Sequence, residues 1–198
     1  MAQSGSTKGR CSVPSISIVT SNQEVIFVSL CYNVDMELFD IVNKKDEVIG
    51  TTDKPTSHST GQLHRVVAVY VLNNEGELYV QVHKKSGGLF DHSVGGHVSK
   101  GEDYVTAVVR EAEEELGIKQ PIPHLSTFYS DEGRLQHMFG LFECVASNDW
   151  HFVPNDEVET IIPMRINDVR EMMTNEPHRF TPGFINTMKE YCKVKGIR

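Results

Sequence analysis

The 198-residue sequence predicts an α+β protein, an α/β/α sandwich in which a mixed β-sheet lies between helices. Three observations support this fold class. A β-hairpin pattern occupies residues 65–83, an amphipathic helix pattern follows at 103–116, and three strand patterns and then two helix patterns come after it. The length suits one domain, which we place at residues 36–198, after an N-terminal extension at 1–35.

The N-terminal extension differs in composition from the rest of the chain. Residues 1–23 are rich in Ser and Thr and hold two basic residues and no acidic ones. This composition is faintly similar to a transit peptide, but a disordered tail is the preferred interpretation. The apolar run Val25–Leu30 that follows is too short to span a bilayer, which takes about 20 residues.

The first part of the domain predicts two short strands and a loop. The stretch "ELFDIV" at 37–42 is a strand candidate, and "NKKDEVIG" at 43–50 supplies a turn and a second short strand. Residues 53–62, "DKPTSHSTGQ", are polar and rich in turn formers. We therefore expect a loop there.

The hairpin is the strongest strand signal in the chain. Arg65–Leu72 is a β-branched run typical of a buried strand, "NNEG" is a turn sequence, and "ELYVQVH" at 77–83 alternates apolar and polar residues. A long glycine-rich loop follows at 84–102, with one short strand expected at 90–94.

A helix is predicted at 103–116, because Asp103 can cap its N-terminus and Gly117 lies where a left-handed backbone often ends a helix. The strands expected after it lie at 124–130, 136–146 and 158–164. Asn167 is the expected cap of a helix at 168–175. A terminal helix at 181–195 would have Pro182 in its first turn.

Charge and cysteine usage narrow the class of protein. A net charge of −8 with no basic stretch argues against a nucleic-acid duplex as partner. An acidic protein can still bind phosphates through bridging divalent cations. No apolar run suggests a membrane span. The four cysteines are far apart and form no CxxC pair, so we expect reduced thiols in the cytoplasm rather than a zinc site or disulfides.

The predicted helix at 103–116 carries several glutamates close together. At about 100° per residue, Glu115 lies about 40° from Glu111, and Glu114 lies about 60° the other way. These three carboxylates share one face, while Glu113 falls on the opposite side. Mg²⁺ prefers oxygen ligands and would offset their mutual repulsion. The geometry alone leaves a solvated acidic face equally open.

The residues around this helix carry a longer motif. The stretch "GHVSKGEDYVTAVVREAEEELGI" resembles the Nudix box, whose pattern is Gly, five residues, Glu, seven residues, Arg-Glu, an apolar residue, any residue, Glu-Glu, any residue, Gly and an apolar residue. The matching residues are Gly96, Glu102, Arg110, Glu111, Ala112, Glu114, Glu115, Gly117 and Ile118. A nine-position match over 23 residues is far more specific than a lone glycine motif.

The resemblance implies a Nudix fold and an enzyme that cleaves a diphosphate linked to another group. It implies Mg²⁺ as cofactor, with Mn²⁺ as a substitute. The catalytic residues that it implies are Glu102, Arg110, Glu111, Glu114 and Glu115. Of these, Glu111, Glu114 and Glu115 would hold the metal.

Other positions of the motif have expected supporting roles. Arg110 is expected to pair with a carboxylate such as Glu102 and to position it. Gly96 and His97 are expected at the substrate, where the missing side chain of Gly96 would let the loop backbone pass close to the helix or the substrate. Gly117 is expected to end the helix.

The resemblance extends to one branch of the family. The stretches "MELFDIVNKKDEVIGTT", "GQLHRVVAVYVLNNEGELYVQVHKK" and "RFTPGF" are similar to isopentenyl-diphosphate-isomerase-like Nudix proteins. In this branch "MELFDIV" reads like a natural start, so we expect either initiation at Met36 or a poorly ordered extension at 1–35.

Chemistry separates the isomerases of this branch from its hydrolases. The isomerases use a cysteine in a "CGH" tripeptide, and the tripeptide here is "GGH" at 95–97. They also carry paired glutamates on a later strand, whereas the corresponding "RLQHMFGLF" has no carboxylate. They have a degraded box, and this chain has an intact one. These three departures predict a hydrolase.

Several side chains keep two interpretations. His58, His64 and His97 fall near places where the isomerases bind metal, but without the glutamates such a site would be incomplete. His64 is expected to form a local hydrogen bond instead. Trp150 and Phe152 either stack on a base or fill an edge of the core. The candidates for the general base, by position only, are Glu132, Glu157 and Glu159.

Three functions follow from these observations. The first is a Mg²⁺-dependent pyrophosphohydrolase acting on a nucleoside diphosphate or a related diphosphate. The second is an isomerase of isoprenoid diphosphates, disfavoured by the missing cysteine. The third is a catalytically silent nucleotide-binding regulator, disfavoured by the intact carboxylates. A small-molecule diphosphate is the expected partner, and a homodimer is the commonest assembly.

Overall fold

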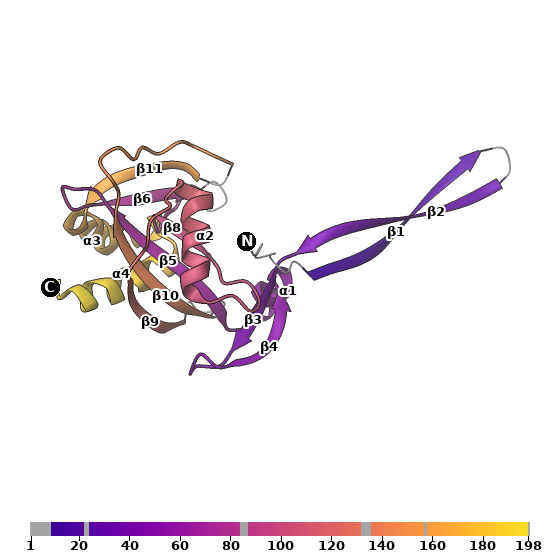
Figure 1. Cartoon of the computed structure of the whole chain (residues 1–198), viewed down its shortest axis with the longest axis horizontal. Coiled ribbons are helices and arrows are strands. Elements are labelled where there is room, and N and C mark those ends of the chain that lie inside the picture. The colour runs from indigo at the N-terminus through magenta and orange to yellow at the C-terminus, as the bar shows by residue number, and fades with distance from the viewer. Residues whose placement is uncertain (1–8, 22–23, 84–86, 132–135, 157, 198) are drawn as a thin grey trace, which may run out of the picture.

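The computed structural model describes most of the chain. The described residues are 9–21, 24–83, 87–131, 136–156 and 158–197. Figure 1 shows a twisted sheet with helix α2 on one face and helices α3 and α4 on the other. The predicted α/β/α sandwich with a mixed sheet is therefore confirmed.

Five strands form the main path of the sheet. β5 (His64–Leu72) lies at its centre and pairs in parallel with β10 (Gln136–Val145). β10 pairs antiparallel with β9 (His124–Asp131). On the other side of β5 lie β6 (Glu77–His83) and then β11 (Val158–Arg165). The predicted hairpin corresponds to β5 and β6, which pair antiparallel beside their turn.

Four short strands lie off this path. β3 (Leu38–Val42) pairs with β4 (Val48–Asp53) and contacts the start of β5. β7 (Phe90–Asp91) pairs with β6, and β8 (Val94–His97) pairs with β5. The single strand expected at 90–94 is therefore two separate strands, because Phe90–Asp91 pairs with β6 whereas Val94–His97 pairs with β5.

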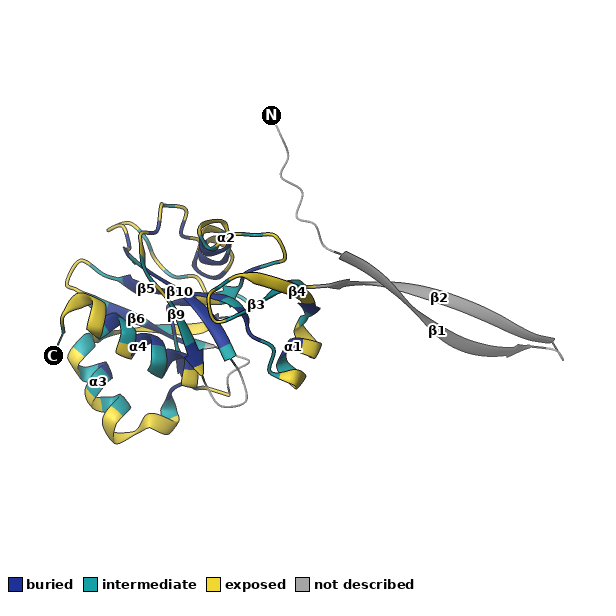
Figure 2. Cartoon of the chain, turned by 90° about the horizontal axis from the view of Figure 1, so that it is seen from below, coloured by how far each residue is buried: buried dark blue, intermediate teal, exposed yellow. Residues whose placement is uncertain are grey.

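The two faces of β5 bury alternate residues in two core clusters. Val67, Val69 and Val71 belong to the cluster that contains α2 (Tyr104–Leu116). Val66, Ala68 and Tyr70 belong to the cluster that contains α4 (Pro182–Lys195). Figure 2 shows the buried strands between these helices. This period of two is the reason that β5 reads as an unbroken apolar run.

Both ends of α2 form as predicted. The Asp103 side chain accepts a hydrogen bond from the backbone N–H of Thr106, at 2.7 Å. Gly117 has a φ of +66°, and its N–H donates to the last carbonyls of the helix. The helix therefore presents Arg110–Glu115 in a fixed rotation relative to the sheet.

The expected loop at 53–62 is wrong. It contains helix α1 (Lys54–Thr60), capped by the Asp53 side chain, which accepts from Thr56 N–H at 2.8 Å. Gly61 ends the helix with a φ of +70°. The sequence does not show this helix by periodicity because it has no apolar face, and its buried residue is Ser57.

A further difference concerns the start of a helix. α3 (Ile166–Asn175) has Arg165 at its N-cap position, so Asn167 is inside the first turn and is not the cap. A 3-10 turn (Pro177–Arg179) and then α4 follow, and Pro182 lies in the first turn of α4 as predicted.

The N-terminal segment, expected without regular structure, contains an antiparallel hairpin of β1 (Gly9–Ser21) and β2 (Glu24–Met36). The β-branched runs in both strands favour that conformation. Figure 1 shows the hairpin leading away from the main sheet. None of the helices in the described ranges is long and apolar enough to cross a membrane.

Candidate active site

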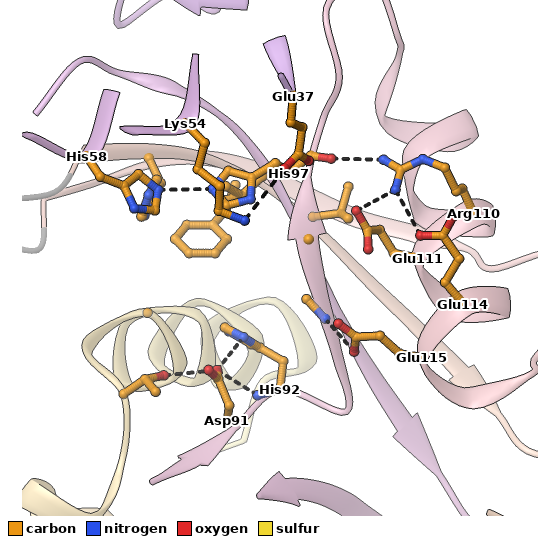
Figure 3. A pocket seen from close by; sticks show the side chains of 18 of the residues that line it. Glu37, Lys54, His58, Asp91, His92, His97, Arg110, Glu111, Glu114 and Glu115 are labelled. Atoms are coloured by element: carbon orange, nitrogen blue, oxygen red, sulfur yellow. Dashed lines mark hydrogen bonds and ion pairs between the residues drawn. The ribbon is translucent and has the colours of Figure 1, made fainter. Parts of the chain in front are cut away.

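One cleft of about 600 Å³ is lined by all of the predicted site residues except Glu102. α1, β8, α2 and the start of α4 contribute to its walls. Figure 3 shows the glutamates of α2 on one side, His58 and His97 on another, and Asp91 and His92 at a third. Segments far apart in the sequence therefore meet at this cleft.

The carboxylates of α2 divide as the helical wheel predicts. Glu111 and Glu115 are 7% and 3% exposed, and Glu114 is exposed to solvent at the rim. All three line the cleft. Glu113 points away and pairs with Lys119 at 2.8 Å. Burial of two ionisable carboxylates is costly without partners, so their contacts decide whether the site is stable.

Glu115 is held by the strands beneath the helix. The buried Gln81 side chain donates from Nε2 to Glu115 Oε2 at 2.9 Å, and Gly95 N–H approaches the same oxygen at 3.4 Å. Gln81 was not among the residues expected at the site. Its signal was a polar residue on the face of β6 that otherwise packs toward α2 through Tyr79.

Arg110 joins the helix to the preceding loop. Its guanidinium donates to both oxygens of Glu102, at 3.1 and 3.0 Å, and to Glu111 Oε1 at 2.7 Å. It also donates to the His97 carbonyl at 3.0 Å and reaches Glu114 at 3.4 Å. The expected contact between Arg110 and Glu102 is thus present. Burial alone would lower the pKa of Arg110, but the bonds to Glu102 and the charge of Glu111 raise it, so the side chain stays charged.

Gly96 lies directly under Glu111. A Cβ atom at Gly96 would overlap the carboxyl carbon and both oxygens of Glu111. Gly96 pairs with Val67 across β8 and β5, which holds its backbone in place. The close approach expected of Gly96 is therefore made to the helix, and the missing side chain leaves room for the Glu111 carboxylate.

Comparisons with known proteins identify the family of the chain. A model of the NUDIX domain matches residues 62–184. The chain belongs to the Nudix family. An isopentenyl-diphosphate Delta-isomerase of Pectobacterium atrosepticum is 27% identical over 152 residues, which cover 73% of this chain and 85% of that protein. An uncharacterized Nudix hydrolase of Yersinia pestis is 30% identical over 160 residues, which cover 77% and 84%.

Solved structures give the same fold. The crystal structure of DR0079 from Deinococcus radiodurans superposes with a TM-score of 0.60 at 25% identity, covering 71% of this chain and 90% of that one. The MutT protein of Methanosarcina mazei shares the fold, with a TM-score of 0.55 at 15% identity. The Nudix likeness of the sequence is confirmed, while its similar relatives carry both hydrolase and isomerase names.

The Nudix carboxylates fit a hard divalent cation. Burial raises the pKa of Glu111 to about 7, although Arg110 opposes the shift, and the charges of Glu114 and Glu37 raise it further. Near pH 7 this carboxyl group is therefore readily protonated, because its burial disfavours the charged form. Oxygen ligands gathered in this way are those that Mg²⁺ prefers, and a bound cation would favour the charged form of each carboxylate.

The three histidines singled out in the sequence also come together. The ring nitrogens of His58, His64 and His97 lie within 4.8 Å of one another, and His58 Nε2 is 3.2 Å from His97 Nε2. His64 Nδ1 bonds locally to the Gln62 carbonyl at 2.7 Å, as expected, while its buried Nε2 has no partner among the described residues. Burial lowers the pKa of His64 to about 4. The imidazole is therefore neutral at pH 7, which is the form that binds metals.

The remaining candidates lie elsewhere. The Trp150 indole N–H donates to the Leu116 carbonyl at 3.0 Å, and the ring packs against Tyr79. It and Phe152 pack on the core cluster beneath α2, which favours the core interpretation. Glu159 is exposed and does not line the cleft. Glu132 and Glu157 lie outside the described residues.

Proposed function

We propose that this protein is a Mg²⁺-dependent pyrophosphohydrolase, with Mn²⁺ as a substitute cofactor. Its substrate would be a nucleoside diphosphate, or a nucleoside diphosphate linked to another group, cleaved at a phosphoanhydride bond. The observation that carries the proposal is the α2 wall of the cleft. There, Glu111, Glu114 and Glu115 line the cleft together, and Glu111 and Glu114 contact Arg110, which is also bound to Glu102.

The residues of the cleft would divide the work. Glu111, Glu114 and Glu115 would hold Mg²⁺, which supplies neutralisation of phosphate charge and activation of water when bound. Arg110 orients Glu111 from the side, and Gln81 orients Glu115 from below. Pre-set ligands need little reorganisation when the substrate binds, which favours catalysis.

On the wall opposite α2, a lysine side chain would contact the substrate directly. Lys54, at the start of α1, lines the cleft, and its Nζ lies 3.6 Å from Glu37. Both side chains are about half exposed, so this pairing is weak and can be exchanged for a phosphate oxygen at small cost. Arg110 is bound to protein carboxylates, which leaves Lys54 better placed for this contact.

A second candidate function is isomerisation of an isoprenoid diphosphate. The cluster of His58, His64 and His97 favours it, together with the isomerase names of some relatives. Against it stand Gly95, where the isomerases have a thiol, and the absence of carboxylates from "RLQHMFGLF". Without these groups, no residue in those positions can move a proton to or from carbon.

A hydrolysis screen would test the proposal. The panel would contain nucleoside di- and triphosphates, ADP-ribose, nucleotide sugars, dinucleoside polyphosphates and isopentenyl diphosphate, with products identified by mass spectrometry. We expect phosphoanhydride cleavage that stops when EDTA removes the metal. Isomerisation of isopentenyl diphosphate would favour the second candidate. Nucleotide binding without turnover of any compound would indicate a silent Nudix domain.

A further inference from the structure

Asp91 is a carboxylate of the cleft that the Nudix box does not include. It ends β7, on the wall formed by the start of α4 (Figure 3). Three hydrogen bonds reach its Oδ1 atom: from His92 N–H at 2.9 Å, from His92 Nδ1 at 2.8 Å and from Thr181 Oγ1 at 2.9 Å. The carboxylate is therefore fixed in orientation through one oxygen.

His92, which binds Asp91, is fixed by hydrogen bonds of its own. His92 Nε2 lies 2.7 Å from Thr187 Oγ1, and Thr187 Oγ1 lies 2.8 Å from the Tyr70 hydroxyl. His92, Thr187 and Tyr70 are all buried. This chain of contacts runs into the core of the α4 face, so His92 cannot turn away without breaking buried hydrogen bonds.

Asp91 lines the cleft, and its second oxygen, Oδ2, remains for a ligand. Every hydrogen bond that the described residues make to this carboxylate ends on Oδ1, and the side chain is 26% exposed. Burial alone would raise the pKa of Asp91, but the charge and hydrogen bonds of His92 and the bond from Thr181 lower it. Oδ2 is thus an ionised acceptor presented to whatever occupies this end of the cleft.

The surroundings of Oδ2 restrict the group that can bind there. The Asp91 carboxylate would repel phosphate oxygens, so the diphosphate would lie away from it, at the walls that carry the α2 glutamates and Lys54. An ammonium group needs several acceptors to replace its water. Apolar Val66, Phe139 and Pro182 and the side-chain-free Gly183 line this part of the cleft and cannot supply them. A neutral hydroxyl with an apolar ring behind it fits both features.

We infer that Asp91 Oδ2 accepts a hydrogen bond from a ribose hydroxyl of the substrate, which makes Asp91 a specificity-determining residue. This inference rests on the proposed function, because it assumes that the diphosphate carries a nucleoside. Phe139 and Gly183 would then face the sugar ring, and His92 and Thr181 would act as positioning residues for Asp91.

Binding of paired probes would test this inference without requiring turnover. The probes are ADP, GDP, CDP and UDP and their 2′,3′-dideoxy counterparts, titrated calorimetrically into the full chain with Ca²⁺ in place of Mg²⁺. A hydrogen bond to a charged acceptor predicts about tenfold or more weaker binding of the dideoxy form of any nucleotide that binds. Asp91→Asn should reduce that ratio to within about threefold. Glu37→Gln, which removes another carboxylate of the cleft, should keep it.

The outcomes separate the two proposals. Equal binding of ribo and dideoxy forms by the wild-type chain would overturn the role of Asp91, and so would a ratio unchanged in Asp91→Asn. Binding of none of the eight nucleotides would overturn it as well. If Asp91→Asn does not fold, Asp91→Ser replaces it, and the wild-type ratio tests the inference on its own. Hydroxyl-dependent binding with no hydrolysis of any compound would contradict the hydrolase proposal alone.

Discussion

Gly95 and Gly96 are adjacent, and we expect opposite effects when each is replaced by alanine. In Gly96→Ala, the new methyl group would occupy the volume of the Glu111 carboxylate. In Gly95→Ala, the nearest atoms to the new Cβ are His92 Nδ1 at 3.5 Å and the Val67 carbonyl at 3.8 Å, which are ordinary contacts. Neither glycine has a positive φ, so backbone strain does not separate the two variants.

The expected size of the effect follows from this overlap. To restore ordinary contact distances, Glu111 must move by more than about 1 Å, which breaks its 2.7 Å bond to Arg110. A displacement of this order at a catalytic group costs roughly 100-fold in rate, and overpacking costs about 1–3 kcal/mol of unfolding free energy. In Gly95→Ala, the restricted unfolded chain instead adds about 0.4–1 kcal/mol of stability.

The assay compares kcat/KM for Mg²⁺-dependent hydrolysis and the melting temperature of both variants. We expect Gly96→Ala to lose about 100-fold in kcat/KM and to melt roughly 2–10 °C lower. Gly95→Ala should lose far less activity and melt no lower than the wild type. Equal losses in the two variants, or an unaffected Gly96→Ala, would refute the assignment of Glu111 to the site.

Two further substitutions and one chemical modification test single residues. Arg110→Lys keeps the charge but cannot bind both oxygens of Glu102, so kcat/KM should fall by about tenfold or more. Retention of full activity would contradict the role of Arg110 in positioning the glutamates. Gln81→Leu leaves Glu115 without its 2.9 Å donor and should lower the unfolding free energy in urea by about 1–3 kcal/mol, whereas an unchanged midpoint would show that Gln81 does not hold Glu115. Burial raises the pKa of Cys144 to about 11. Peptide mapping after thiol alkylation at pH 8 should therefore find Cys144 modified only when the chain is unfolded. Rapid modification of the native chain would disprove its burial.

The Nudix helix could be predicted from the sequence because its signals are local. Asp103, the spacing of the glutamates and Gly117 all lie within one stretch, and each obeys a rule of helix geometry. The burial of Glu111 and Glu115 beside an exposed Glu114 follows from the same rotation.

The other walls of the cleft depend on contacts that no local pattern records. Asp91 and Thr181 are 90 residues apart and meet because β7 lies against the start of α4. His58 reaches the cleft on α1, whose polar sequence has no helical periodicity. The alternating pattern of β6 predicts which face of the sheet Gln81 lies on, but it does not predict that Gln81 contacts Glu115. These residues could be placed once the strand order was known.

The most direct test of the central claim is the rate of phosphoanhydride cleavage as a function of Mg²⁺ concentration in Glu114→Gln and Glu113→Gln. The two variants make the same chemical change at neighbouring positions of one helix, and Glu114 lines the cleft whereas Glu113 pairs with Lys119 outside it. We predict that Glu113→Gln follows the wild-type Mg²⁺ curve and that Glu114→Gln loses about 100-fold or more in rate. Equal Mg²⁺ responses in the two variants would contradict a metal site on the α2 wall.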